Sequence, residues 1–218
     1  MEPINRMSAK ELVTEKLREA IYKGTFHAGE ELIQEKISEQ LGVSRMPVRE
    51  AFLVLENAGL IEIKRNKRAV VKEITVESVQ EQLEIRILLE CLAGKKACRN
   101  GGSYENLICI QRQIKGCLEG EPKQEEFRFL NKEFHYEIWR LANSPRLEQM
   151  LQQLWFSMPS VYPRDIPQNI RRNIEEHQYI IDALLNHDER QVEKAITEHI
   201  NRTENLVKFL LHQTQDDR

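Results

Sequence analysis

Long hydrophobic runs are absent from the sequence. Nowhere do apolar residues approach the roughly 18 in succession that a membrane-spanning helix needs. No apolar segment follows the charges of the first six residues, as it would in a signal peptide. Apolar residues make up 40% and charged residues 31% of the 218 positions, a balance typical of globular domains. We therefore expect a cytoplasmic protein that does not bind a membrane and is long enough for two modest domains.

Cysteine is scarce, and none of the four cysteines belongs to a C-x-x-C pair. Spacings of seven and eight residues suit the buried faces of helices better than a zinc knuckle. The sequence also lacks a phosphate-binding loop and an activated-nucleophile motif, which argues against the common enzyme classes. We interpret the thiols as small core residues in a reducing compartment: Cys91, Cys98, Cys109 and Cys117.

Net charge is small, −3 at neutral pH, which by itself argues against a nucleic-acid binder. The distribution of charge along the chain matters more than the net charge. Within residues 44–72 there are seven basic side chains against three acidic ones. Such a concentration of positive charge indicates a local contact with nucleic acid rather than a generally basic protein.

The first 75 residues predict three helices and a β-hairpin. Ser8 and Glu11 have the spacing of a capping box, which begins a helix over 8–23. A second helix is predicted from about residue 31 to residue 41 and a third from 44 to 58, each ended by glycine. The apolar period then changes to that of strands at 61–63 and 69–71, on either side of a basic loop.

The rest of the chain has helical periodicity to its end. Predicted helices cover about 76–99, 103–118, 124–142, 144–157, 168–187 and 189–212. The fold class is therefore mainly α. We expect a winged helix-turn-helix, three helices plus a hairpin, over residues 1–75, and an all-α antiparallel helical bundle over residues 76–218.

Residues 34–53 suit a helix-turn-helix, in which two helices pack at a steep angle across a short turn. Ser38 is the small residue at the helix contact, Gly42 provides the turn, and Val48 belongs to the apolar inner surface. The leading turn of the third helix is then free to enter a major groove. We expect DNA contacts from Ser44, Arg45, Met46, Pro47 and Arg49, and from Lys64, Arg65, Asn66 and Lys67 in the hairpin loop. The alternative is an αα-hairpin with a charged solvent face.

The stretch from Gly42 to Phe52, followed by Leu55 and by residues 59–61, resembles the signature of GntR-type bacterial regulators. The helical remainder resembles the ligand-binding FCD subgroup of that family. This resemblance implies a homodimer that binds double-stranded DNA at a short palindrome, with an effector that alters the affinity. It also implies that Arg45 and Arg49 read the operator. Glu35 departs from members that carry a basic DNA-contacting residue there, so we assign it no contact.

Three of the six histidines fall inside predicted helices of the second domain: His135, His177 and His199. Imidazoles that converge from three helices would form a divalent-metal site, although a single helical histidine is more often a surface or hydrogen-bonded core residue. Many FCD domains carry Asp-x-x-x-His on one helix and a histidine on each of two later helices. That resemblance implies a metal, zinc among the candidates, held by the three histidines. Asn131 stands at the place of the aspartate, where it offers a carbonyl oxygen without charge.

Arg86 lies four residues before Glu90 and matches an Arg-x-x-x-Glu pattern of the family's first sensor helix. The resemblance implies that it pairs with an effector carboxylate, whereas an ordinary ion pair with Glu90 is the alternative. The sequence thus predicts a transcription regulator, not an enzyme, that senses a small carboxylate. Two other functions stay open at this point: a metal-dependent enzyme in the bundle, and a DNA binder that responds to no ligand.

Overall fold

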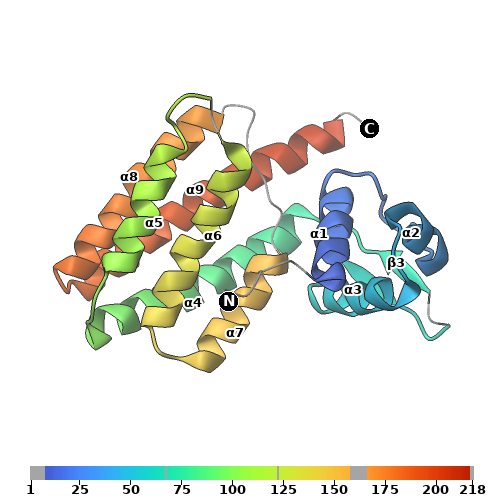
Figure 1. Cartoon of the computed structure of the whole chain (residues 1–218), viewed down its shortest axis with the longest axis horizontal. Coiled ribbons are helices and arrows are strands. Elements are labelled where there is room, and N and C mark those ends of the chain that lie inside the picture. The colour runs from blue at the N-terminus through green and yellow to red at the C-terminus, as the bar shows by residue number, and fades with distance from the viewer. Residues whose placement is uncertain (1–7, 67, 122, 158–165, 217–218) are drawn as a thin grey trace, which may run out of the picture. The chain divides into compact units, whose positions relative to one another are not determined.

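The computed structural model describes residues 8–66, 68–121, 123–157 and 166–216, with side chains described as far as residue 202. Helices dominate, and one small three-stranded sheet accompanies them (Figure 1). The chain forms two compact units whose main boundary lies between Thr75 and Val76. The predicted fold class, a winged helix-turn-helix followed by a helical bundle, is confirmed.

The first unit consists of three helices and the sheet. The strand order is β1-β3-β2, with both pairings antiparallel. Ala69 of the central strand pairs with Leu32 on one side and with Ile63 on the other. The elements are α1 (Ala9–Tyr22), β1 (Glu31–Leu32), α2 (Gln34–Leu41), α3 (Arg45–Asn57), β2 (Ile61–Ile63) and β3 (Ala69–Val71).

Local signals set the helix ends. The Ser8 side chain accepts from the backbone N–H of Glu11, whose carboxylate accepts from the Ser8 N–H, so the predicted capping box is present. Gly42 ends α2 in the left-handed region, at φ 64°, where only glycine avoids a steric cost. The Val43 N–H then donates to the carbonyl of Ser38 at 3.0 Å. This turn fixes the angle at which α3 leaves α2.

The prediction of a helix from about residue 31 was wrong, because Glu31–Leu32 form a strand and α2 begins only at Gln34. The Leu32 side chain is buried against the first unit's core. The apolar spacing of this segment fits either a helix or a strand. The strand forms because residues 69–70 pair with it. The predicted hairpin thus becomes a three-stranded sheet.

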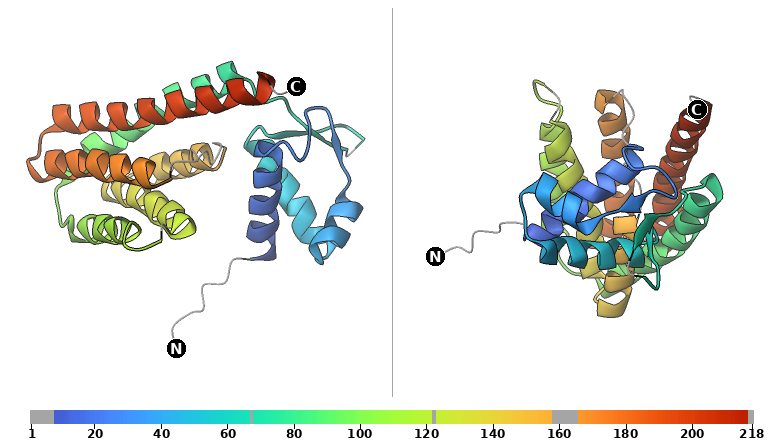
Figure 2. Two further views of the ribbon diagram at one scale, coloured as in Figure 1. Left: turned by 90° about the horizontal axis from the view of Figure 1, so that it is seen from above. Right: turned by 90° about the vertical axis from the view of Figure 1, so that its right-hand side faces the viewer.

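The second unit consists of helices joined by short loops, and its described residues include no strand. Helices α4 and α9 lie side by side along it (Figure 2). Gly94 permits this approach, since a Cβ there would lie 2.4 Å from Cδ1 of Ile196. The helices are α4 (Val76–Asn100), α5 (Glu105–Gly116), α6 (Gln124–Leu141), α7 (Pro145–Ser157), α8 (Ile166–Leu185) and α9 (Glu189–Asp216).

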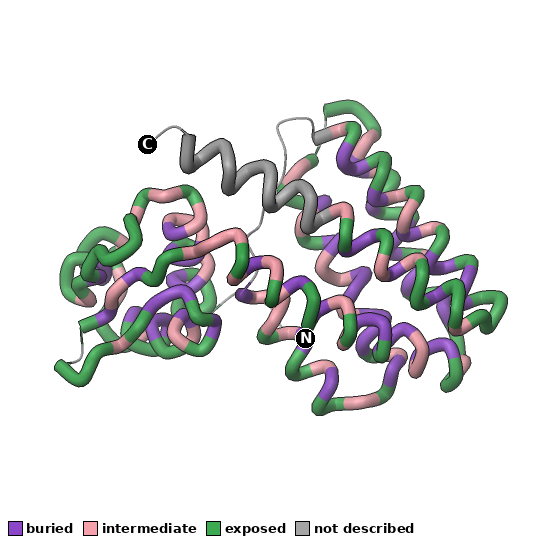
Figure 3. Tube along the Cα trace, turned by 180° about the vertical axis from the view of Figure 1, so that it is seen from behind, coloured by how far each residue is buried: buried purple, intermediate pink, exposed green. Residues whose placement is uncertain are grey.

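Burial follows the amphipathic pattern within each unit, with buried and exposed positions alternating along the helices (Figure 3). Cys91, Cys98 and Cys117 are buried and free. The interpretation of Cys109 as a core residue was wrong, because it lies on the exposed side of α5. Among the described residues, no helix is both long and apolar enough to span a membrane.

Candidate DNA interface and metal centre

The leading turn of α3 presents a polar surface. Ser44 is the N-cap residue, but its hydroxyl makes no capping hydrogen bond, so it is not used to satisfy the helix end. Arg45, Met46 and Arg49 are exposed, whereas Val48 between them is fully buried. Pro47 is half-buried in the first turn, where its missing N–H has no intrahelical role. The predicted contact residues of this helix therefore lie on its outer side, except for the partly covered Pro47.

Two residues of α2 fix the start of α3. The Gln34 amide donates to the carbonyl oxygen of Arg45 at 2.6 Å, and the Glu35 carboxylate forms an ion pair with the Arg45 guanidinium. Glu35, to which we assigned no DNA contact, thus orients Arg45, which is predicted to contact the bases. No sequence signal distinguished this pair, since the two residues are ten positions apart on different helices.

The hairpin loop between β2 and β3 exposes the other predicted contacts. Lys64, Arg65 and Asn66 are exposed, and Lys67 lies outside the described residues. The Lys64 N–H donates to the carbonyl of Arg68 at 2.9 Å. The Asn66 side chain accepts from the Arg68 N–H at 3.2 Å. These bonds join the two sides of the loop, and its described basic side chains are exposed to solvent.

The second unit brings its three predicted histidines together. His135 of α6, His177 of α8 and His199 of α9 are all buried, and one potential ligand atom of each lies within 4.8 Å of the others. The Nε2 atoms of His135 and His199 are 3.1 Å apart. Two imidazole nitrogens on one metal, at about 2.0–2.1 Å from it, stand about 2.9–3.4 Å apart. This spacing therefore suits shared ligation.

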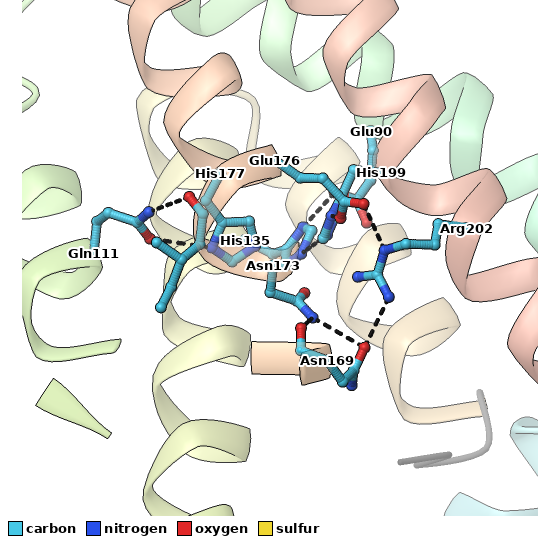
Figure 4. A network of polar contacts seen from close by, with 10 residues as sticks. Glu90, Gln111, His135, Asn169, Asn173, Glu176, His177, His199 and Arg202 are labelled. Atoms are coloured by element: carbon cyan, nitrogen blue, oxygen red, sulfur yellow. Dashed lines mark hydrogen bonds and ion pairs between the residues drawn. The ribbon is translucent and has the colours of Figure 1, made fainter. Parts of the chain in front are cut away.

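Each histidine is held through its other nitrogen (Figure 4). The Nδ1 of His135 donates to Glu90 of α4 at 2.8 Å, and that of His199 donates to Glu176 of α8 at 2.7 Å. The Nδ1 of His177 is 3.3 Å from the Gln111 amide oxygen. Gln111 itself is fixed, because its amide nitrogen donates to the Ile174 carbonyl at 2.7 Å. Protons at all three Nδ1 positions leave lone pairs at the three Nε2 atoms.

Within the histidine cluster, two buried polar atoms have no hydrogen-bond partner among the described residues: Nε2 of His177 and Oδ1 of Asn131. Asn131 lies one turn before His135 on α6, so the two side chains share a helix face. An unpaired buried acceptor costs about 1–3 kcal/mol. A cation bound at Nε2 of the histidines and at the asparagine oxygen would satisfy these acceptors.

The ionisation of the cluster follows from burial and charge. Burial, with the charges of His199 and His135, holds the pKa of His177 well below its usual value. Burial also lowers the pKa of His199 to about 4, although Glu176 opposes the shift. Burial alone would raise the pKa of Glu90, but Arg86 and His135 hold it below its usual range. The neutral form is therefore favoured for His177 and His199, and it is the form in which an imidazole binds a metal.

Arg86 forms the ion pair with Glu90 that was the alternative to an effector contact. Its Nε donates to Glu90 at 2.6 Å, and both side chains are buried. The Arg86 guanidinium also lies over the Trp155 ring, 4.5 Å from the centroid. Since the second oxygen of Glu90 accepts from His135, one carboxylate joins the arginine to the histidine cluster. The ion pair with Glu90 is therefore present, and an effector role for Arg86 stays a prediction.

Sequence reasoning missed most of the supporting residues. Gln111 was not singled out, and neither was Arg202, which donates to Glu176 and to Asn169. Glu176 was not expected to hold His199, as it does here. No periodic signal identifies these partners, because each pairs across helices.

Comparison with known proteins identifies both units. Residues 9–71 match the family described as bacterial regulatory proteins, gntR family, and residues 81–202 match the FCD domain. The chain belongs to the GntR family of bacterial regulators and carries an FCD domain. It is a DNA-binding transcription regulator, and the relatives found are named as regulators rather than enzymes.

Several relatives span most of the chain. The HTH-type transcriptional regulator McbR of Escherichia coli is 27% identical over 84% of this chain and 85% of its own length. A solved structure of E. coli McbR/YncC superposes with a TM-score of 0.74, at 25% identity, and covers 96% of this chain and 100% of its own. A probable D-xylose utilization operon transcriptional repressor of Paenarthrobacter nicotinovorans is 29% identical over 83% of this chain and 80% of its own length.

Proposed function

We propose that this regulator holds a divalent metal ion in its helical domain and changes its operator affinity when a small carboxylate joins that ion. The observation that carries the proposal is the convergence of three buried imidazoles whose Nδ1 atoms are already bonded. Two unshared lone pairs at 3.1 Å repel unless a proton or a cation lies between them. His135, His177 and His199 would ligate the ion, with the Asn131 oxygen as a fourth ligand.

The charge around the cluster favours a carboxylate as effector. Glu90 is paired with Arg86, and Glu176 with Arg202, so the charges of the groups around the histidines are balanced before any metal arrives. A divalent ion then adds two positive charges to a buried site, which is costly unless an anion follows. Three imidazoles and one amide oxygen would fill four positions, so a six-coordinate ion would keep two positions for carboxylate oxygens. Arg86 would neutralise part of the effector's charge with its remaining N–H donors.

Helix α4, which carries Arg86 and Glu90, follows the β2–β3 hairpin in the chain, since it begins five residues after β3 ends. A change in how Glu90 or Arg86 is held therefore acts on the helix next to the DNA-binding unit in the chain. This is the route by which we propose that effector binding alters DNA affinity.

The DNA-binding form in this proposal is a homodimer on a palindromic operator, acting in the cytoplasm. Arg45 and Arg49 would read base edges in the major groove, since arginine pairs bidentately with guanine. Ser44, Met46 and Pro47 would line the groove beside them. Lys64, Arg65, Asn66 and Lys67 would follow the phosphate backbone.

Two measurements on the purified full chain test the proposal. Selection of duplexes from a random library, followed by titration at several salt concentrations, should yield a palindrome bound specifically and with steep salt dependence. Metal analysis, and thermal unfolding with Zn²⁺ and citrate added singly and together, should show the largest stabilisation with both. Specific DNA binding without any metal-dependent stabilisation would overturn the sensor half of the proposal and leave the DNA half standing.

A further inference from the structure

Both tryptophans of the chain lie beside the histidine cluster. The ring centroid of Trp155, near the end of α7, is 4.9 Å from that of His135. Trp139, one turn after His135 on α6, has its ring centroid 5.9 Å from that of Trp155 and 4.7 Å from that of Tyr136. Three rings from two helices therefore form an aromatic group next to His135, made of Tyr136, Trp139 and Trp155.

Arg86 joins this aromatic group to the charged residues of the cluster. Its guanidinium carbon lies 4.5 Å from the centroid of the Trp155 ring, where a cation is attracted to the face of the indole. Among the described residues, the only hydrogen bond of its side chain runs from Nε to Glu90, although a guanidinium has five N–H donors. An anionic group beside Trp155 would therefore find unused donors on Arg86.

The aromatic group also contains an unsatisfied donor. The Trp139 side chain is 1% exposed, and its indole N–H has no hydrogen-bond partner among the described residues. A buried donor without an acceptor is costly, so an acceptor atom carried by a ligand would stabilise this position. Trp155, by contrast, is partly exposed, which makes its ring the one that a ligand can approach from solvent.

These features favour one class of carboxylate over another. A polyhydroxylated acid would bury many hydroxyl groups against rings that offer few hydrogen bonds, and each unpaired hydroxyl would cost free energy. An aromatic acid would bury a flat apolar ring against other rings, in the offset or edge-to-face contacts that aromatic pairs prefer. Its carboxylate would then reach Arg86, which already lies over the face of Trp155.

We propose that the effector is an aromatic carboxylate, whose ring packs on Trp155 and whose carboxylate pairs with Arg86 beside the histidine cluster. The inference rests on the proposed function and names the chemical class of its effector. A ring substituent with a lone pair, such as a hydroxyl group, would accept a hydrogen bond from the Trp139 N–H.

The first test compares benzoate with cyclohexanecarboxylate, two acids with the same charge and the same number of ring carbons. Isothermal titration calorimetry of the Zn²⁺-loaded full chain should give an affinity about two- to tenfold higher for benzoate, because an aromatic contact adds to the burial of the ring. Tryptophan fluorescence should also change on titration with benzoate. Since both tryptophans belong to the aromatic group, that change reports binding at this place.

Variants of Trp155 test whether its ring causes the preference. Trp155→Leu should abolish the preference for benzoate over cyclohexanecarboxylate, whereas Trp155→Phe should keep most of it. The ratio of the two affinities isolates the ring contact, because a displaced Arg86 or a loosened fold would weaken both acids alike. Phe129→Leu is the matched control. Phe129 is 62% exposed on α6, so this variant loses an aromatic ring outside the group and should keep the preference.

A variant of Trp139 tests the hydrogen bond separately. Either meta- or para-hydroxybenzoate should bind more tightly than benzoate, because its hydroxyl oxygen accepts from the Trp139 N–H. Trp139→Phe keeps an aromatic ring but removes the donor, so it should abolish this gain and leave the affinity for benzoate itself unchanged. A gain that persists in Trp139→Phe would overturn the contact with Trp139.

The remaining outcomes separate this inference from the proposed function. Equal affinities for benzoate and cyclohexanecarboxylate, or a preference that Trp155→Leu retains, would overturn the aromatic effector and leave the carboxylate sensor standing. Failure of every carboxylate, citrate included, to bind the Zn²⁺-loaded chain would overturn the proposed sensor itself.

Discussion

The two units carry their functional residues in opposite ways. The DNA-binding unit exposes charged side chains on a short stretch, from Ser44 in α3 to the loop that follows Lys64. The helical unit buries its polar groups and collects them from five helices, α4, α5, α6, α8 and α9. An exposed charge needs no partner, whereas a buried polar group needs every bond satisfied. The local sequence pattern therefore predicts the DNA contacts, whereas only tertiary packing assembles the histidine cluster.

Removal of a metal ligand should give the largest effect. We expect His199→Ala to weaken Zn²⁺ binding more than 100-fold, beyond the roughly 10- to 100-fold typical of outer-shell changes. Isothermal titration calorimetry of the full chain would measure it. His187→Ala is the matched control, since that side chain lies at the α8–α9 turn, outside the cluster. Equal Zn²⁺ affinity in both variants would show that the histidine cluster does not bind the metal.

Loss of a single base-contacting arginine should have the next largest effect, and it should change DNA binding alone. Arg49→Ala should cost about 1–3 kcal/mol of specific DNA binding and leave metal affinity unchanged. Arg190→Ala removes the same charge from an exposed position on α9 and should leave specific binding intact. Fluorescence anisotropy with the selected palindrome would measure both. If the two variants bind equally well, Arg49 does not read the operator.

Loss of a supporting carboxylate should have a smaller effect on metal affinity than loss of a ligand. Glu176→Gln keeps the shape of the side chain but removes the charge that holds His199 and Arg202. We expect an approximately 10- to 100-fold loss of metal affinity, measured by competition with a chelator. Glu175→Gln, on the exposed side of the same helix, is the control. An unchanged affinity in Glu176→Gln would show that His199 needs no such support.

The smallest expected effect is a pH dependence of the metal-free bundle. The folded chain holds the pKa values of His177 and His199 below the usual value of about 6.5. The unfolded chain therefore binds more protons below that pH, and stability falls as the pH is lowered. The slope is at most about 1.4 kcal/mol per pH unit for each histidine. Urea unfolding in EDTA between pH 7 and 5 would measure it, and His199→Gln should reduce the slope.

The fold followed closely from the sequence, because its signals are local. The capping residues Ser8 and Glu11, the turn at Gly42 and the alternation at 61–63 each act within a few residues of chain. The prediction failed at Glu31–Leu32, where the strand depends on residues almost 40 positions away. Cys109 failed for a related reason, since helical spacing alone did not tell the buried side of α5 from the exposed side.

The histidine cluster was predicted in part. His135, His177 and His199 were expected to converge, and the structure brings them together. Glu90 was expected only as the partner of Arg86, yet its second oxygen holds His135. Gln111 and Arg202 carried no signal, because amides and arginines on helices are usually solvent-facing and their partners lie 63 and 26 residues away.

The amino-acid order by itself determined which segments are helices, where the chain turns, and which short basic stretch faces outward, since these depend on neighbours along the backbone. Tertiary structure alone decided which nitrogen of each imidazole is engaged and which carboxylates and amides hold it. Those features arise from groups far apart in the chain, whose burial makes a missing partner costly and so selects a single arrangement.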